Sequence, residues 1–158
     1  MNAIAKFIGA FAPRMEILDY RDGGSDEPTL FSCLFDGTAV VLLADVPQSK
    51  HDSIEIRMFG IAPKMQRQGL GRRLLNEITA WADTERVVLN CEAKLIDLAA
   101  FDFTLAAYNK LLLEDGMIGK PFGNTLNDFD WSNVLIENHG FERGRGLELK
   151  RVPRKSNE

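Results

Sequence analysis

The stretch "IEIRMFGIAPKMQRQGLGRRLL", residues 54–75, decides the fold of this chain. Its first part alternates in polarity, which predicts a strand over 53–61. One face of this strand is expected to carry Ile54, Ile56 and Met58, and the other Glu55, Arg57, Phe59 and Ile61. Pro63 ends the strand, and the glycines at 69 and 71 begin a helix. Its apolar residues recur at helical spacing: Leu70, Leu74, Leu75, Ile78, Trp81 and Ala82.

The turn between this strand and this helix is basic. Lys64, Arg67, Arg72 and Arg73 surround the two glycines, and no acidic residue lies between Lys64 and Arg73. A glycine-containing loop that leads into a helix presents free backbone N–H groups, and the helix dipole reinforces them. Glycine lets the backbone come close to a guest, because it has no Cβ. The turn therefore predicts a site for a phosphorylated cofactor.

Two common phosphate loops fit less well. The pattern G-x-x-x-x-G-K-[ST] is absent. A dinucleotide fingerprint needs a third glycine where this chain has Leu74, and the polar "KMQRQ" separates the strand from the glycines. Glu92 does lie near the distance expected of a ribose-binding acid, so a nucleotide-binding domain remains an alternative.

The rest of the chain reads as α+β around a mixed sheet. Residues 1–13 predict a short amphipathic helix and 14–20 a strand. Segments 29–35 and 39–46 flank Asp36-Gly37-Thr38, which predicts a hairpin and, with 53–61, a three-strand meander. The helix after Gly69 leads to a strand over 86–91, a crossover that favours two parallel strands. Further on we expect a helix over 98–113, a loop over 116–130, a short helix closed by Gly140 and a last strand over 147–152.

Length and composition predict one cytoplasmic domain over 1–158. A chain of 158 residues with 45% hydrophobic and 27% charged residues is ordinary for one globular domain. The formal net charge of -4 does not favour nucleic acid or a membrane surface as partner. No apolar run reaches the roughly 20 residues of a membrane span. Cys33 and Cys91 are expected to be buried free thiols of a reducing compartment, and His51 and His139 surface residues that bind no metal.

The sequence resembles the GNAT superfamily of acetyl-CoA-dependent N-acetyltransferases. The family signature [QR]-x-x-G-x-[GA] is matched by residues 66–71, and the alternating strand, the I-x-P before the loop and the following helix match as well. The likeness continues through "VVLNCE" to Gly140-Phe141 before the last strands. It implies a mixed, mostly antiparallel central sheet flanked by helices, and acetyl-CoA as co-substrate.

The resemblance also implies a set of site residues. The pyrophosphate of CoA would bind the loop formed by Gln66, Arg67, Gln68, Gly69, Leu70, Gly71 and Arg72. The pantetheine arm would lie between strands 53–61 and 86–91, with its acetyl carbonyl bonded to the backbone of Phe59, Gly60 and Ile61. Glu55 would take the proton of the amine, since an alkylamine with a pKa near 10.4 is mostly protonated at pH 7. Tyr108 would protonate the departing sulfur.

Each catalytic residue has a structural alternative. Glu55 could be a sheet-face residue paired with Arg57, which would lower its pKa and make it a poorer base. Tyr108 could be a core residue, because it lies in the apolar stripe of the helix over 98–113 with Leu105 and Leu112.

The chain departs from the family at two places. Phe101 and Ile136 stand at the spacings where many members carry an Asn and a Tyr, and a segment that includes 120–131 is inserted between them. The N-terminal helical region is shortened, because only "RDGGSDEP" (21–28) joins the first two strands. The inserted segment or the second subunit of a homodimer would then cover the acceptor groove.

The sequence thus predicts an N-acetyltransferase that moves the acetyl group of acetyl-CoA directly to a primary amine. The acceptor is a small molecule or a protein, and the acidic patches favour a cationic one. The alternative is a catalytically silent acyl-CoA-binding regulatory module.

Overall fold

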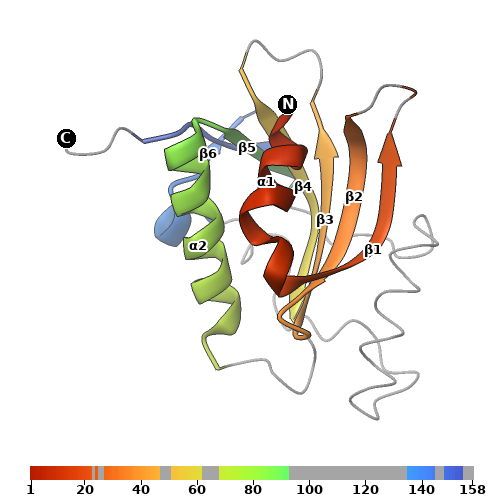
Figure 1. Cartoon of the computed structure of the whole chain (residues 1–158). Helices are drawn as coiled ribbons and strands as arrows, with labels where there is room; N and C mark the ends of the chain where they lie inside the picture. Colours follow the sequence, from red (N-terminus) through yellow and green to blue (C-terminus); the bar gives the residue numbers. More distant parts are fainter. Residues whose placement is uncertain are drawn as a thin grey trace.

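A seven-stranded mixed sheet forms the centre of the molecule, in the order β1-β2-β3-β4-β5-β7-β6 (Figure 1). The computed structural model describes residues 1–22, 24, 27–46, 51–61, 68–92, 135–144 and 148–154. The strands are β1 (Met15–Asp22), β2 (Pro28–Phe35), β3 (Ala39–Asp45), β4 (Ser53–Ile61), β5 (Val88–Glu92), β6 (Glu142–Arg143) and β7 (Glu148–Arg151). The helices are α1 (Ala3–Phe11), the 3-10 turn η1 (Ala12–Arg14) and α2 (Leu70–Glu85), and a helical turn covers 135–139. The α+β class and the mostly antiparallel sheet are as predicted.

Strands β1 to β4 form one antiparallel meander, one strand longer than the expected three. The predicted hairpin joins β2 to β3. Asp36 and Gly37 have φ values of 53° and 67°, and the Thr38 N–H donates to the Phe35 carbonyl over 3.0 Å. Two successive positive φ values define the tight turn whose twist matches that of the flanking strands, which is why Asp-Gly predicts it.

The crossover β4–α2–β5 is also confirmed. β4 and β5 run parallel, with Ser53 opposite Val88 and Ile56 opposite Cys91. The apolar stripe of α2 is buried at Leu74, Leu75, Ile78, Trp81 and Ala82. The connection therefore places α2 on one face of the sheet, with its start close to the end of β4.

The predicted face alternation of β4 is wrong beyond Arg57, because the strand contains a β-bulge. Leu43 pairs with Ile56 but Leu42 pairs with Met58, so Arg57 is an extra residue. An extra residue shifts a strand's side chains by one position and thus to the opposite face. Phe59, opposite Val41, consequently packs against the core that contains Ile54 and Ile56, although it was expected on the other face.

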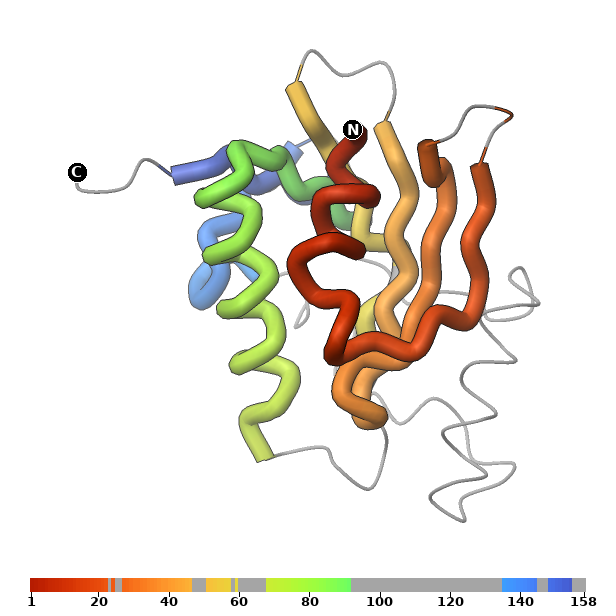
Figure 2. Tube along the Cα trace, viewed as in Figure 1, coloured from red at the N-terminus to blue at the C-terminus, as the bar shows by residue number. Residues whose placement is uncertain are grey.

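Helices α1 and α2 lie side by side over the same face of the sheet (Figure 2). Asn2 caps α1, because its side chain accepts a hydrogen bond from the Ala5 N–H. Phe7 contacts Trp81 of α2 edge to face, with ring centroids 5.3 Å apart, and Phe11 contacts Phe35 of β2 at 5.4 Å. The predicted N-terminal helix is therefore a structural part of the core that holds α2 in place.

The C-terminal strands close the sheet beyond β5. β7 lies where the last strand was expected, and the short edge strand β6 was not predicted as a separate element. Gly140, with φ of 77°, ends the helical turn as expected. The predicted helix over 98–113, which contains Tyr108, and the loop over 116–130 lie outside the described residues.

His139 was expected on the surface but is buried, with 5% of its area exposed. Its carbonyl accepts a hydrogen bond from Arg151 Nε over 2.8 Å, which ties the helical turn to β7. Burial, and then the charges of Arg72 and Arg151, lower the pKa of His139. No local pattern indicated this burial, because a single polar residue beside a glycine is typical of an exposed helix end. His51 is exposed, and the free thiols Cys33 and Cys91 are buried, as predicted.

Candidate active site

At the start of α2, three backbone N–H groups have no partner within the helix. Gly69 occupies the N-cap position in the left-handed region, with φ of 77° and ψ of 8°. The first helical hydrogen bond runs from the Arg73 N–H to the Gly69 carbonyl over 3.0 Å, so the amides of Leu70, Gly71 and Arg72 have no acceptor within the helix. An added Cβ at Gly69 would meet no atom within 4 Å, so the space beside this backbone is open.

The charges at this helix start suit an anion. The first turn of α2 contains no acidic residue, although acidic side chains are the ones that stabilise a helix N-terminus. Arg72 and Arg73 are exposed, and neither has an acidic partner among the residues that the structure describes. Two such cations each oppose the dipole by about 0.3–1 kcal/mol, and a bound anion would reverse that cost.

β4, the strand that precedes this helix, extends beyond its ladder with the parallel strand β5. In the described part of the chain, the ladder between β4 and β5 stops at the pair Ile56–Cys91. The ladder between β4 and β3 continues to the pair Ile61–Ala39. Residues 57–61 therefore extend past the end of the β4–β5 ladder, and the bulge at Arg57 begins at the same point. Phe59, Gly60 and Ile61, predicted to bind the acyl arm, all lie in this stretch.

Glu55 lies two residues before this point, in a row of polar residues that crosses three strands. Its register partner on β5 is Asn90, and the partner of Asn90 on β7 is Lys150. Leu89 and Cys91 belong to the core under the helices, so Asn90 and Glu55 lie on the opposite face of the sheet. Asn90 was not predicted as a site residue. Its only signal was one polar residue inside the apolar run "VVLNC".

The predicted alternative contact of Glu55 is present. Arg57 Nε lies 3.4 Å from Glu55 Oε1, and the two side chains are 39% and 32% exposed. A pair this exposed contributes about 0–1 kcal/mol, so it does not hold the carboxylate in place against a ligand.

The structure therefore arranges the predicted site residues in two groups. One group, Gln68 and residues 69–72, lies at the start of α2. The other group, Glu55 and residues 59–61, belongs to β4, the strand that precedes this helix in the chain. Gln66, Arg67 and Tyr108 lie outside the described residues.

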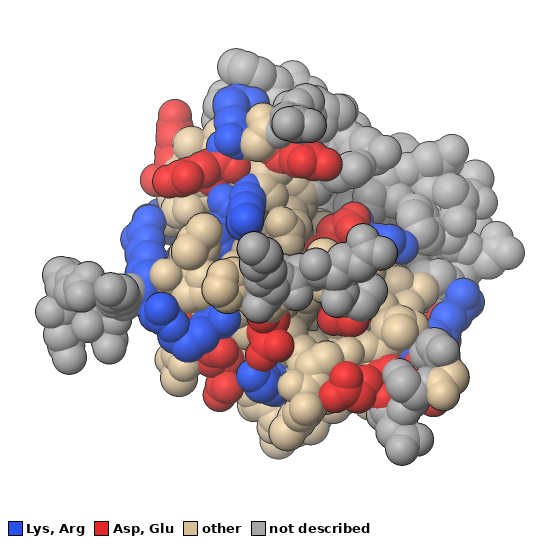
Figure 3. Space-filling model, turned by 90° about the horizontal axis from the view of Figure 1, so that it is seen from above, with Lys and Arg blue, Asp and Glu red and all other residues tan. Residues whose placement is uncertain are grey.

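The acidic residues at the opposite end of the sheet are partly neutralised by basic neighbours. Lys6 pairs with Asp52, the N-terminal amine lies 3.1 Å from Glu27, and Arg21 lies 3.1 Å from Asp19. Figure 3, which views the molecule from above, shows basic and acidic side chains intermixed over this face. Of these carboxylates only Glu27 belongs to the acidic stretch 21–28, and Asp128 and Asp130 lie outside the described residues, so a cationic acceptor stays a prediction.

Comparison with known families identifies the class of protein that has this fold and this helix start. Residues 5–104 match the family described as Acetyltransferase (GNAT) family. The chain belongs to the GNAT acetyltransferase family, whose general activity is acetyl transfer. No curated protein sequence matches the chain. Among the described residues, no helix is long and apolar enough to span a membrane, and no cluster of metal-ligating side chains is present.

Proposed function

We propose that this protein is an N-acetyltransferase that transfers the acetyl group of acetyl-CoA directly to a primary amine. The observation that carries the proposal is the combination of two features at one place. β4 continues past its ladder with β5, and the next described element along the chain is a glycine-capped helix start with two arginines that have no acidic partner in the described part of the chain. An extended acyl arm can add beside such a strand, and a diphosphate can bind such a helix start.

In this proposal, the helix start binds the diphosphate of acetyl-CoA and the end of β4 binds its thioester. The amides of residues 70–72 and the guanidinium of Arg72 bind the diphosphate, and Gly69 leaves room for it. The backbone of residues 59–61 aligns the thioester. Acetyl-CoA supplies an activated acyl group, so the chain itself needs to orient the two substrates and accept one proton from the amine.

Glu55 accepts that proton through water. It lies four residues before Phe59, about 13 Å along the strand at 3.3 Å per residue, so a relay of more than one water fits this distance and direct contact does not. Asn90 and Lys150, which share its row, can hydrogen-bond such a water. Tyr108 remains the candidate acid for the sulfur; a thiol with a pKa near 8.5 leaves tolerably without one.

The acceptor is a small-molecule or protein amine that meets the protein on the face bearing Glu55 and Asn90. We propose that the protein is cytoplasmic. Both cysteines are buried free thiols, and free thiols are typical of proteins in a reducing compartment.

Substitution of Glu55 by Gln tests the proposal, with CoA release followed against a panel of primary amines. Loss of a general base lowers kcat by about 10²–10⁴-fold while acetyl-CoA still binds. Glu85→Gln, at the far end of α2, removes an exposed carboxylate outside the site and serves as the control. If Glu55→Gln keeps full activity with the best amine, Glu55 is not the base.

A melting experiment tests the cofactor separately. A ligand at a hundred times its dissociation constant adds about 2.7 kcal/mol to the free energy of unfolding. Acetyl-CoA and CoA are expected to raise the melting temperature. A rise with NAD or ATP and none with acetyl-CoA would show that the site is not an acyl-CoA site.

The alternative is a silent acyl-CoA-binding module, in which Glu55 serves only as the exposed partner of Arg57. This alternative predicts a melting shift with acetyl-CoA and no CoA release with any amine.

A further inference from the structure

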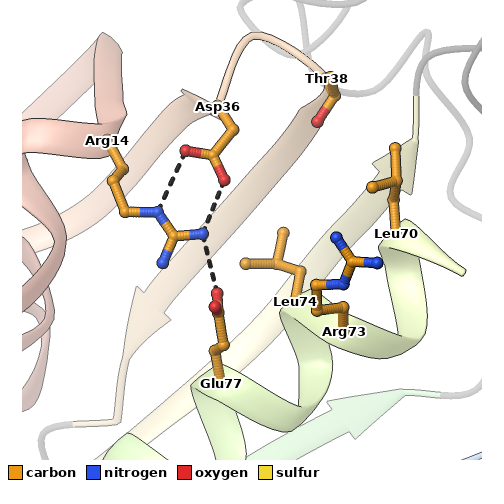
Figure 4. A pocket seen from close by; sticks show the side chains of 7 residues that line it. All are labelled: Arg14, Asp36, Thr38, Leu70, Arg73, Leu74 and Glu77. Atoms are coloured by element: carbon orange, nitrogen blue, oxygen red, sulfur yellow. Dashed lines mark hydrogen bonds and ion pairs between the residues drawn. The ribbon is translucent and has the colours of Figure 1, made fainter.

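A pocket of about 260 Å³ lies between the first two turns of α2 and the turn that joins β2 to β3 (Figure 4). Seven side chains line it: Arg14, Asp36, Thr38, Leu70, Arg73, Leu74 and Glu77. The buried residues of α2 begin at Leu74, so the helix start at Gly69 precedes the part of α2 that the core holds. Close packing against the β2–β3 turn therefore does not fix the position of this helix start.

One arginine joins the two walls of the pocket. Arg14 donates hydrogen bonds to both carboxylate oxygens of Asp36, over 3.1 Å from Nε and 2.7 Å from Nη2. The same Nη2 lies 2.9 Å from Oε2 of Glu77, in the second turn of α2. The guanidinium also stacks on Phe35, with 4.7 Å between its central carbon and the ring centre. Arg14 thus connects η1 and the β2–β3 turn to α2.

The orientation of Arg14 is fixed without any help from α2. The Asp36 N–H donates to the Arg14 carbonyl over 2.8 Å, and the tight turn holds Asp36 at φ of 53°. A planar guanidinium that binds a carboxylate through two N–H groups and stacks on a ring has a defined direction. Its remaining contact, with Glu77, therefore holds α2 at a set distance from the β2–β3 turn.

The two carboxylates share this one cation. Among the described residues, only Arg14 forms an ion pair with Asp36 or Glu77, although Arg73 lines the same pocket. The side chains of Arg14, Asp36 and Glu77 are 39%, 46% and 38% exposed, so the network adds little to the stability of the whole fold. Its removal would instead leave two like charges on opposite walls of the pocket, which favours separation of the helix from the turn.

A small shift of α2 matters at its first residues. Glu77 lies eight residues after Gly69, about 12 Å along the helix at 1.5 Å per residue. A rotation of the helix about its buried residues therefore moves the amides of residues 70–72. Backbone N–H groups bind an oxygen only within about 2.7–3.2 Å, so a displacement of this kind weakens a bound anion.

We propose that Arg14 is a positioning residue for the cofactor site. By binding Asp36 and Glu77 at once, it holds the start of α2 where its amides reach the diphosphate of an acyl-CoA whose arm lies along β4. Arg14 itself does not contact the cofactor. The inference rests on the proposed function, because it takes the diphosphate to bind at this helix start.

Glu77→Ala separates positioning from simple charge attraction. The substitution breaks the link between Arg14 and α2, and alanine preserves the helix. Positioning predicts that CoA binds about tenfold more weakly, because the helix start is released. Charge attraction alone predicts tighter binding, because a carboxylate near an anion site has been removed. Calorimetric titration of CoA measures the dissociation constant, and the KM for acetyl-CoA is expected to rise while kcat at saturation changes less than twofold.

Three further variants accompany it. Arg14→Gln is expected to weaken CoA binding about tenfold. Arg14→Lys keeps the charge but lacks the rigid fork that binds two carboxylates, so it is expected to remain about threefold weaker than wild type. Glu85→Ala removes an exposed carboxylate from the far end of α2 and is expected to leave the dissociation constant unchanged.

The outcomes separate this proposal from the function on which it rests. If the wild type does not bind CoA, the proposed cofactor site is wrong and the role of Arg14 is overturned with it. If the wild type binds CoA but Glu77→Ala binds it equally or more tightly, the cofactor site stands and Arg14 does not position it. Full recovery of affinity in Arg14→Lys would also overturn the proposal, because charge alone would then suffice. Thermal melting without ligand checks the folding of each variant, and a lowered melting temperature with an unchanged dissociation constant would assign the network to stability alone.

Discussion

Replacement of Arg151 by Met tests how the C-terminal strand is held on the fold. Arg151 is 3% exposed and forms a two-point pair with Asp83 of α2, at 2.7 Å from Nη1 and 3.0 Å from Nη2. Its Nε also binds the carbonyl of His139. One side chain thus connects β7, the C-terminal half of α2 and the helical turn over 135–139.

The expected loss of stability in Arg151→Met comes from Asp83, which keeps its charge but loses its ion-pair partner. Removing one member of a buried ion pair costs about 3–5 kcal/mol, because the other charge is left uncompensated. The Asp83 side chain is 27% exposed and also accepts the Arg154 N–H, so water and one hydrogen bond still stabilise the carboxylate. We therefore expect the lower end, about 3 kcal/mol, which lowers the melting temperature of a chain this long by roughly 6–12 °C.

The loss should depend on pH in one direction. Burial raises the pKa of Asp83, but its hydrogen bonds with Arg151 and with the Arg154 N–H outweigh that effect and lower it overall. A carboxylate with a lowered pKa stabilises the fold above its unfolded pKa of about 3.9, and this contribution disappears as pH falls through the folded value. The difference between wild type and Arg151→Met is therefore constant near neutral pH and shrinks below about pH 4.

Urea unfolding and thermal melting by circular dichroism measure these differences. Arg86→Met is the control, because it removes an exposed arginine from the same region. The double variant Asp83→Leu with Arg151→Met leaves no unpaired charge and is expected to be more stable than Arg151→Met alone. The reasoning would be refuted by a single variant that melts within about 2 °C of wild type, or by strictly additive losses.

Three further predictions concern other parts of the molecule. Gly69→Glu places a side chain at φ of 77° and costs about 1–2 kcal/mol of stability, yet abolishes the CoA-induced melting shift; retained binding would exclude this helix start as the site. Phe7→Ala removes the ring that contacts Trp81 and costs about 3–5 kcal/mol in urea unfolding, whereas a cost below 1 kcal/mol would mean that α1 is not part of the core. Arg72→Gln removes one of the charges that lower the pKa of His139, so that pKa rises in an NMR titration; an unchanged value contradicts the coupling.

The sequence by itself determined the local elements, because their signals lie within a few residues of each other. Asp36-Gly37 fixed the hairpin through its tolerance of positive φ, and the spacing of apolar residues fixed α2. The glycines and arginines at the start of α2 pointed to an anion site before any fold was known. The family resemblance implied a mixed, mostly antiparallel sheet flanked by helices, and the structure and the family match agree with it.

Tertiary structure alone decided which distant residues meet. The bulge at Arg57 depends on pairing with β3, so no pattern within the strand could show that Phe59 faces the core. Asn90 lies opposite Glu55 because a crossover sets β4 and β5 in parallel register. His139 is buried in a helical turn that Arg151 ties to β7. The pocket beside α2 likewise needs Arg14, Asp36 and Glu77 from three separate elements. The spacing of neighbouring residues specifies local backbone conformation. The environment of a side chain depends on segments far away in the sequence, and no local pattern shows which of these segments will pack against it.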